Sequence, residues 1–171
     1  MPNNFILKKV ASIVTKFNTR NPFEICDGLS INIYYKNLGH SVKAFYFYQS
    51  RIKNIIINTC NDDINSNMLC AHELGHAILH NDIATSFACL NNAMFDLTRK
   101  TELEANLFAA ELLISDEVLL ELLKEEKTVF AIASELSLPY QLLDFKLAIL
   151  NAKGYPITPQ NISSSNFLKY L

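Results

Sequence analysis

The segment Cys70–His80 carries two histidines four residues apart, His72 and His76, with Glu73 directly after the first. On an α-helix, residues at this spacing lie about 6 Å apart along the axis and about 40° apart around it. Both imidazoles can therefore reach one ion from one helix face, which is the geometry of a zinc hydrolase site with Glu73 placed to hold a water. The alternative is a surface helix that carries the spacing by chance. The apolar, helix-forming flanks favour the metal site.

The length and composition are typical of one globular domain. The chain has 171 residues, half of them hydrophobic, and we expect a single domain over residues 1–171. A formal net charge of −2 argues against a primary nucleic-acid surface. The sequence shows no export signal, no apolar run long enough for a membrane span and no Cys-x-x-Cys pair among its four cysteines. These features predict a cytoplasmic protein with reduced thiols, and a disulfide framework is the weaker alternative.

Hydrophobic periodicity divides the chain into a mixed first half and a helical second half. Helices are predicted within residues 1–20 and 70–80, at 101–114, after Ser115, and at 128–136 and 140–151, with strands at 29–34, 43–48 and 52–58. The short connections between the strands suit an antiparallel meander. Residues 155–171 should form an irregular tail. The expected fold is α+β, a small antiparallel three-stranded sheet with a zincin-like active-site helix and a mostly helical C-terminal half.

Within the histidine helix, Leu74 and Ile78 should face the core, and the two histidines should lie on an adjacent face. Gly75 sits in the middle of this helix, where glycine costs roughly 1 kcal/mol against alanine. We therefore expect a neighbouring element or a substrate to approach closely at Gly75.

A third protein ligand is needed, and the downstream candidates are Glu102, Glu104 and Glu111. Glu102 shares its helix face with small and apolar residues, and a carboxylate buried there must be bound or neutralised. Glu104 faces towards Glu111 on what should be a wetter side, and it can close a capping box with Thr101. We therefore predict Glu102 as the third ligand. The alternative for Glu102 is a solvated glutamate in the first turn of a helix.

Four further residues near the motif or of a ligand type need a role. Asn106, one turn after Glu102, is placed to support a ligand through a hydrogen bond. His80 lies about 12 Å along the axis from His72, too far for the same ion, so it is a supporting or surface residue. Cys70 is predicted as a packed thiol and His40 as an exposed loop residue.

Three segments resemble the ImmA/IrrE family of metallo-endopeptidases: Ile55–Asn58, His72–His80 and Glu102–Leu113. The resemblance extends from about residue 21 to residue 154. It implies one zinc ion held by His72, His76 and Glu102, with Glu73 as the catalytic glutamate. The sequence departs from the family at 114–115, where Ile-Ser replaces the usual Met-Pro, which changes a helix junction and not the chemistry.

The resemblance also implies a function. Family members cleave repressor-type transcription factors of phages and mobile elements, so we expect a zinc-dependent antirepressor protease whose protein substrate is a helix–turn–helix repressor. Direct nucleic-acid binding and membrane association are not expected. One alternative is a zinc-containing binding module that inactivates a repressor or antitoxin by contact, and another is a toxin-linked regulator. The oxyanion could be stabilised by His80 or by one of several tyrosines, among which the sequence does not choose.

Overall fold

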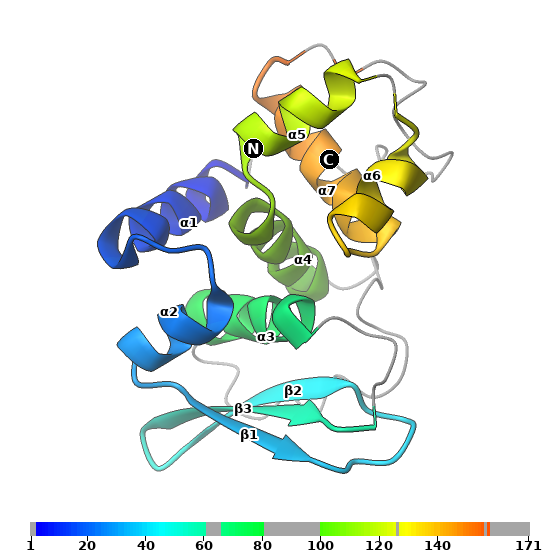
Figure 1. Cartoon of the computed structure of the whole chain (residues 1–171). Coiled ribbons are helices and arrows are strands. Elements are labelled where there is room, and N and C mark those ends of the chain that lie inside the picture. The colour runs from blue at the N-terminus through cyan, green and yellow to red at the C-terminus, as the bar shows by residue number, and fades with distance from the viewer. Residues whose placement is uncertain (1–2, 61–65, 81–99, 126, 156, 158–171) are drawn as a thin grey trace.

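The computed structural model describes residues 3–60, 66–80, 100–125, 127–155 and 157. Its layers are a sheet, a central helix and an outer group of helices (Figure 1). The elements are α1 (Asn3–Phe17), α2 (Pro22–Gly28), β1 (Asn32–Lys36), β2 (Ala44–Gln49), β3 (Ile52–Asn58), α3 (Ser66–Leu79), α4 (Lys100–Leu113), α5 (Asp116–Lys124), α6 (Val129–Glu135) and α7 (Tyr140–Ala152). The α+β prediction is confirmed. Among the described residues, no helix is both long and apolar enough to cross a bilayer.

The sheet has the order β1-β3-β2, so the prediction of an antiparallel meander was wrong. β2 and β3 form an antiparallel hairpin, in which Ser50 and Arg51 both adopt positive φ. β1 instead pairs in parallel with β3 and begins at Asn32, three residues later than expected. The chain therefore leaves β1 and crosses to the far side of β3 before it enters β2.

The Asn58 side chain holds this crossover in place. Its Oδ1 accepts a hydrogen bond from the Leu38 amide at 3.0 Å, and its Nδ2 donates to the carbonyls of Gly39 and Val42 at 2.6 and 2.5 Å. One buried amide thus satisfies three backbone groups of the connection that would otherwise lack partners. The loop between β1 and β2 is thus bound to the last residue of β3, the strand with which β1 pairs in parallel.

Helix α3 lies between the sheet and α4, and it contacts β2, β3 and α2 as well (Figure 1). Residues 68–75 are all buried. The core contact of Leu74 is as predicted, but the helix is enclosed on nearly every side and has no open polar face. A functional site on α3 is therefore formed largely inside the protein.

Gly75 makes the close approach that its position predicts, and the neighbour is α4. A Cβ added at Gly75 would lie 3.1 Å from the Cα of Ala105 and 3.3 Å from the Cβ of Phe108. These separations are shorter than the roughly 3.5–4.0 Å at which carbon atoms pack. Glycine thus allows α3 and α4 to meet with their backbones almost in contact.

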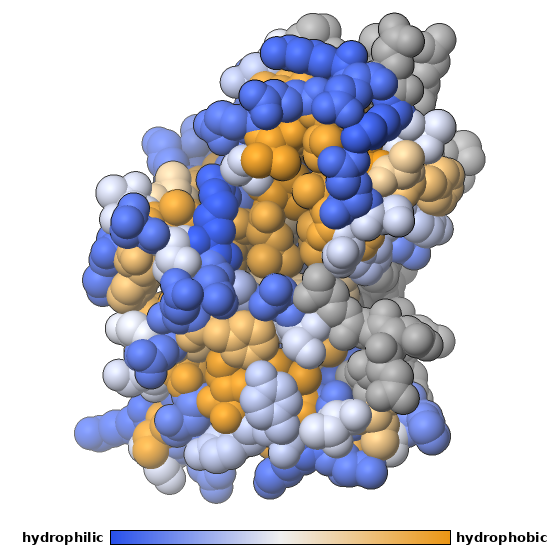
Figure 2. Space-filling model, viewed as in Figure 1, coloured by the Kyte–Doolittle hydropathy of each residue, from blue (hydrophilic) through white to orange (hydrophobic). Residues whose placement is uncertain are grey.

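The apolar side chains form two clusters. The larger joins α1, α2, the sheet, α3, α4 and part of α7, and the smaller joins α5, α6 and the opposite side of α7. Figure 2 shows hydrophobic residues gathered over α4 and α7 and again at the level of α3 and the sheet. α7 contributes to both clusters, and it is the element that ties the C-terminal helices to α4.

Four charged side chains, those of Glu111, Asp116, Lys146 and Lys153, pair where α4, α5 and α7 meet. Lys146 is 0% exposed, and its Nζ lies 2.5 Å from carboxylate oxygens of both Glu111 and Asp116. Lys153 pairs with the same two acids at 2.8 and 2.7 Å. The expectation of a wetter side at Glu111 was wrong, because this glutamate is buried in an ion-pair network.

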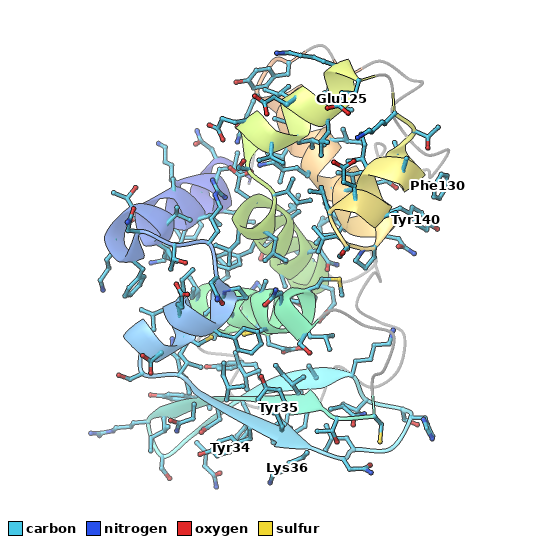
Figure 3. All side chains as sticks on the ribbon, in the orientation of Figure 1. Tyr34, Tyr35, Lys36, Glu125, Phe130 and Tyr140 are labelled. Carbon is cyan, nitrogen blue, oxygen red and sulfur yellow. The ribbon has the colours of Figure 1, made fainter. Side chains whose placement is uncertain are left out.

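The α6–α7 pair does not present a free recognition helix. Residues 142–150 of α7 are all buried, and only the start of the pair exposes aromatic rings, Phe130 and Tyr140, with centroids 5.1 Å apart (Figure 3). α7 is therefore a core helix. Gly154, with φ of +92°, follows its end as predicted, while the predicted tail at 155–171 lies almost entirely outside the described residues.

Candidate metal centre

Helix α3 brings His72 and His76 together as their spacing predicts. Their Nε2 atoms lie 3.2 Å apart, and their rings meet edge to face. His72 is 1% exposed and His76 is half-buried. Two imidazole nitrogens therefore point at one small volume inside the protein.

Glu102 reaches the same volume from the first turn of α4. Its Oε2 lies 3.3 Å from His72 Nε2 and its Oε1 lies 3.5 Å from His76 Nε2. The residue is 2% exposed, as the buried-face prediction requires. Burial alone opposes ionisation of this carboxyl, but the two imidazoles outweigh it and lower the pKa of Glu102 to about 2.

The other ring nitrogen of each histidine already has a partner. His72 Nδ1 lies 3.0 Å from Asn106 Oδ1, an oxygen that can only accept, so the proton of His72 is on Nδ1. His76 Nδ1 lies 3.1 Å from His80 Nδ1. Asn106 therefore lies against one of the two histidines, and its role in supporting a metal ligand stays a prediction.

With its proton on Nδ1, His72 turns the lone pair of Nε2 towards the Glu102 carboxylate, a poor arrangement unless a cation lies nearby. Glu102 Oε2 is buried and has no hydrogen-bond partner. Ligand atoms about 2.0–2.1 Å from a tetrahedral zinc ion lie about 3.4 Å from one another. The observed separations of 3.2, 3.3 and 3.5 Å match that spacing. The His-His-Glu cluster therefore fits a metal ion.

The charge of the site also favours a cation. Burial disfavours protonation of His76, yet Glu102 and Glu73 outweigh it and the pKa of His76 is raised. The pocket thus attracts positive charge at the point where the three donors meet. Among the described residues this is the one cluster of metal-binding side chains that converges in this way.

Glu73 is 1% exposed and follows His72 directly along α3. A glutamate placed to hold a water, as the sequence predicts, is thus enclosed by the protein. Its role as the catalytic glutamate stays a prediction.

Sequence reasoning left His80 open and missed Glu104. His80 Nδ1 contacts His76 Nδ1, and His80 Nε2 lies 2.9 Å from Glu104 Oε2, so His80 is joined to the cluster while its supporting role stays a prediction. The predicted capping box was wrong, since Thr101 lies inside α4, which begins at Lys100. One signal was available: His80 repeats the four-residue spacing of His72 and His76 and so lies next to His76 on the helix.

Cys26, Cys60 and Cys70 are not part of this cluster. Cys70 packs against Cys26 with the two Sγ atoms 3.9 Å apart, and both thiols are free and buried. The contact with Cys26, together with burial, raises the pKa of Cys70 and keeps it protonated. Cys70 is thus a packed thiol, as expected, and His40 is exposed. Cys89 falls outside the described residues.

Residues 26–148 match the family model described as the IrrE N-terminal-like domain, a peptidase family. The chain belongs to this family. The match covers all three strands, helices α3 to α6 and most of α7, and so includes both helices of the candidate metal centre. Membership agrees with the ImmA/IrrE resemblance of the three motifs and supports a metallopeptidase.

Two relatives match most of the length of this chain. The chain is 36% identical over 145 residues to uncharacterized immunity region protein 2 of Bacillus phage phi105, covering 85% of this chain and 90% of that protein. It is 30% identical over 166 residues to metallopeptidase ImmA of Bacillus subtilis (strain 168), covering 93% of this chain and 94% of ImmA. The similarity to ImmA therefore spans nearly the full length of both proteins.

Proposed function

We propose that this protein is a zinc-dependent endopeptidase that cleaves a repressor-type transcription factor of a phage or mobile element. The observation that carries the proposal is the meeting of His72, His76 and Glu102 donor atoms at separations of 3.2–3.5 Å. Two nitrogens and a carboxylate leave one tetrahedral position open, which is the arrangement of catalytic rather than structural zinc sites.

The chemistry is hydrolysis of a peptide bond. When bound, a zinc ion in such a site acidifies a water molecule and polarises a carbonyl oxygen. Glu73 accepts a proton from the water while the oxygen of the water bonds to the scissile carbonyl carbon. Glu73 then delivers that proton to the amine nitrogen, which leaves as the C–N bond breaks. His72, His76 and Glu102 stay in place throughout. The burial of His72 and Glu102 limits the access of competing solvent to the site.

An extended segment of the substrate can pair with the sheet. β2 is an edge strand of the three-stranded sheet and contacts α3, which carries the two histidines. Main-chain pairing along such an edge is a common mode of peptide recognition. It would bring a scissile bond close to α3 without requiring many specific side-chain contacts.

The choice of a repressor as substrate rests on the relatives. One is an immunity region protein of a phage, and the other is the metallopeptidase ImmA. The ImmA/IrrE resemblance of the three motifs adds the repressor itself, whose removal would release silenced genes. A substrate of this kind would place the reaction in the cytoplasm.

The decisive experiment is to incubate the zinc-loaded protein with the repressor encoded nearest its gene and to look for fragments by mass spectrometry. The matched control is Glu73→Gln, which keeps the side-chain shape and the three metal-binding residues but lacks a proton-accepting carboxylate. We expect wild type to cut and the variant to bind zinc without cutting, with a rate at least about 100-fold lower.

The second candidate function is a binding module that inactivates its partner by contact. The same variant separates the two in cells that carry a repressor-controlled reporter. If Glu73→Gln relieves repression as fully as wild type, cleavage is unnecessary and the binding-module function replaces the peptidase.

A further inference from the structure

A chain of hydrogen-bonding groups connects the candidate ligand His76 to an acid outside the ligand set. His76 Nδ1 lies 3.1 Å from His80 Nδ1, and His80 Nε2 lies 2.9 Å from Glu104 Oε2. His80 is the residue directly after α3, and Glu104 belongs to α4. This series of hydrogen-bonding groups therefore connects α3 to α4, the two helices that form the candidate metal centre.

Only one placement of protons satisfies every member of this chain when His76 Nε2 holds a metal. A ligating Nε2 is unprotonated, so neutral His76 carries its proton on Nδ1 and donates it to His80 Nδ1. An accepting Nδ1 in turn fixes the proton of neutral His80 on Nε2, where it is donated to the Glu104 carboxylate. The carboxylate is the natural end of the chain because it only accepts.

We propose that Glu104 and His80 are positioning residues that hold His76 in the orientation and tautomer needed to bind the metal. This inference rests on the proposed zinc site. Metal-binding histidines commonly donate their second ring proton to a carboxylate or carbonyl, and such partners set ring orientation and raise ligand basicity. Here the carboxylate acts through a second histidine, which extends its reach from α4 to His76.

The two histidines are consequently held in different ways. His72 donates directly to Asn106, a neutral and buried amide. His76 is linked through His80 to a negative charge that is partly exposed, since the Glu104 side chain retains 22% of its accessible surface. A charged end should strengthen the basicity of His76 more than an amide strengthens that of His72.

The competing explanation for Glu104 is an ordinary surface ion pair. Lys100 lies one turn earlier on α4, with its Nζ 3.7 Å from Glu104 Oε1. Its side chain is 79% exposed, and such pairs contribute little. Lys100 therefore offers a matched control, because Lys100→Gln removes the positive charge that pairs with Glu104 and leaves the contact between Glu104 and His80 intact.

The experiment measures zinc affinity by competition with a chromophoric chelator in the full-length protein. Glu104→Leu removes both the charge and the acceptor, and we expect zinc to bind about 10- to 100-fold more weakly. Glu104→Gln keeps an acceptor oxygen but loses the charge, so its loss should be smaller. His80→Phe should resemble Glu104→Leu, and Lys100→Gln should match wild type.

A second measurement reads the protons directly and does not depend on activity. Long-range ¹H–¹⁵N spectra of the histidine rings in the zinc-loaded protein should show His76 protonated on Nδ1 and His80 protonated on Nε2. In Glu104→Leu the His80 ring should lose this single tautomer. Circular dichroism and urea unfolding of the metal-free variants establish that a change in affinity does not come from unfolding.

The outcomes distinguish this inference from the proposed function. If wild type binds zinc and cleaves its substrate but Glu104→Leu has unchanged affinity, or His80 carries its proton on Nδ1, the positioning role is wrong and the peptidase stands. If the His72→Ala variant binds zinc as tightly as wild type, the metal centre itself is wrong and both proposals fail. Weakened binding in Glu104→Leu and His80→Phe, with Lys100→Gln unchanged, supports the positioning role.

Discussion

Replacing Gly75 by alanine tests whether the contact between α3 and α4 sets the geometry of the metal centre. The new Cβ would lie 3.1 Å from Ala105 Cα, 3.2 Å from the Ala105 carbonyl oxygen and 3.3 Å from Phe108 Cβ. The first two are backbone atoms, so no rotamer change relieves them. To restore contacts of about 3.5–4.0 Å, α4 must move away by about 0.5 Å.

Two effects on stability oppose each other. Overpacking a tight interface costs about 1–3 kcal/mol, whereas alanine gains about 1 kcal/mol over glycine in a helix interior. We expect the free energy of unfolding of the metal-free protein to fall by about 1 kcal/mol in Gly75→Ala. Urea unfolding in the presence of a chelator measures this change.

Gly75→Ala should also weaken the binding of zinc. Glu102 belongs to α4 and lies 3.3 and 3.5 Å from the two imidazole nitrogens of α3. Binding sites tolerate displacements of only about 0.5 Å, so we expect zinc affinity to fall about tenfold. Chelator competition measures it, and Ser12→Ala on the exposed face of α1 is the control for helix propensity alone. A Gly75→Ala protein that is at least as stable as wild type and binds zinc equally well would refute the reasoning.

The remaining predictions concern the ion-pair network. Lys146→Met leaves the buried carboxylate of Glu111 and the partly exposed one of Asp116 with only Lys153 as a cation. We expect a loss of about 3 kcal/mol in the free energy of unfolding, measured in urea at neutral pH, and a change below about 1 kcal/mol would contradict this. Burial opposes ionisation of Asp116, but Lys146 and Lys153 outweigh it and lower the pKa of Asp116. A lowered pKa in the folded state means stability that is present above the unfolded value of 3.8 and is lost as pH falls below it. The urea midpoint should therefore drop as the pH falls below about 4, and Asp116→Asn should reduce that drop. An equal drop in both proteins would show that Asp116 is not its source.

The ligand pattern could be predicted because its spacing is local. A helix fixes the relation of His72 and His76, and the apolar neighbours of Glu102 predict that its carboxylate is buried. Gly75 likewise predicts a close neighbour, since glycine in a helix interior needs a compensating contact. These inferences depend only on residues within about two turns of one another.

The sheet and the charged groups could not be predicted in this way. Alternation shows where strands lie but not which strands pair. The parallel partner of β1 is β3, whose last residue, Asn58, binds the loop some 20 residues earlier in the chain. Glu111 looked solvated because its partners, Lys146 and Lys153, come from α7. The role of Glu104 was hidden for the same reason, because its partner His80 is 24 residues away.

The sequence by itself therefore determined the helices, the two imidazoles that share a face and the acid most in need of a cation. Only the tertiary structure decided that α4 lies against Gly75, that Glu102 meets His72 and His76, and that Glu104 reaches His80. The physical reason is range. Backbone hydrogen bonding and side-chain periodicity act over a few residues, whereas the partner of a buried charge is whichever group the packed core brings within about 3 Å of it.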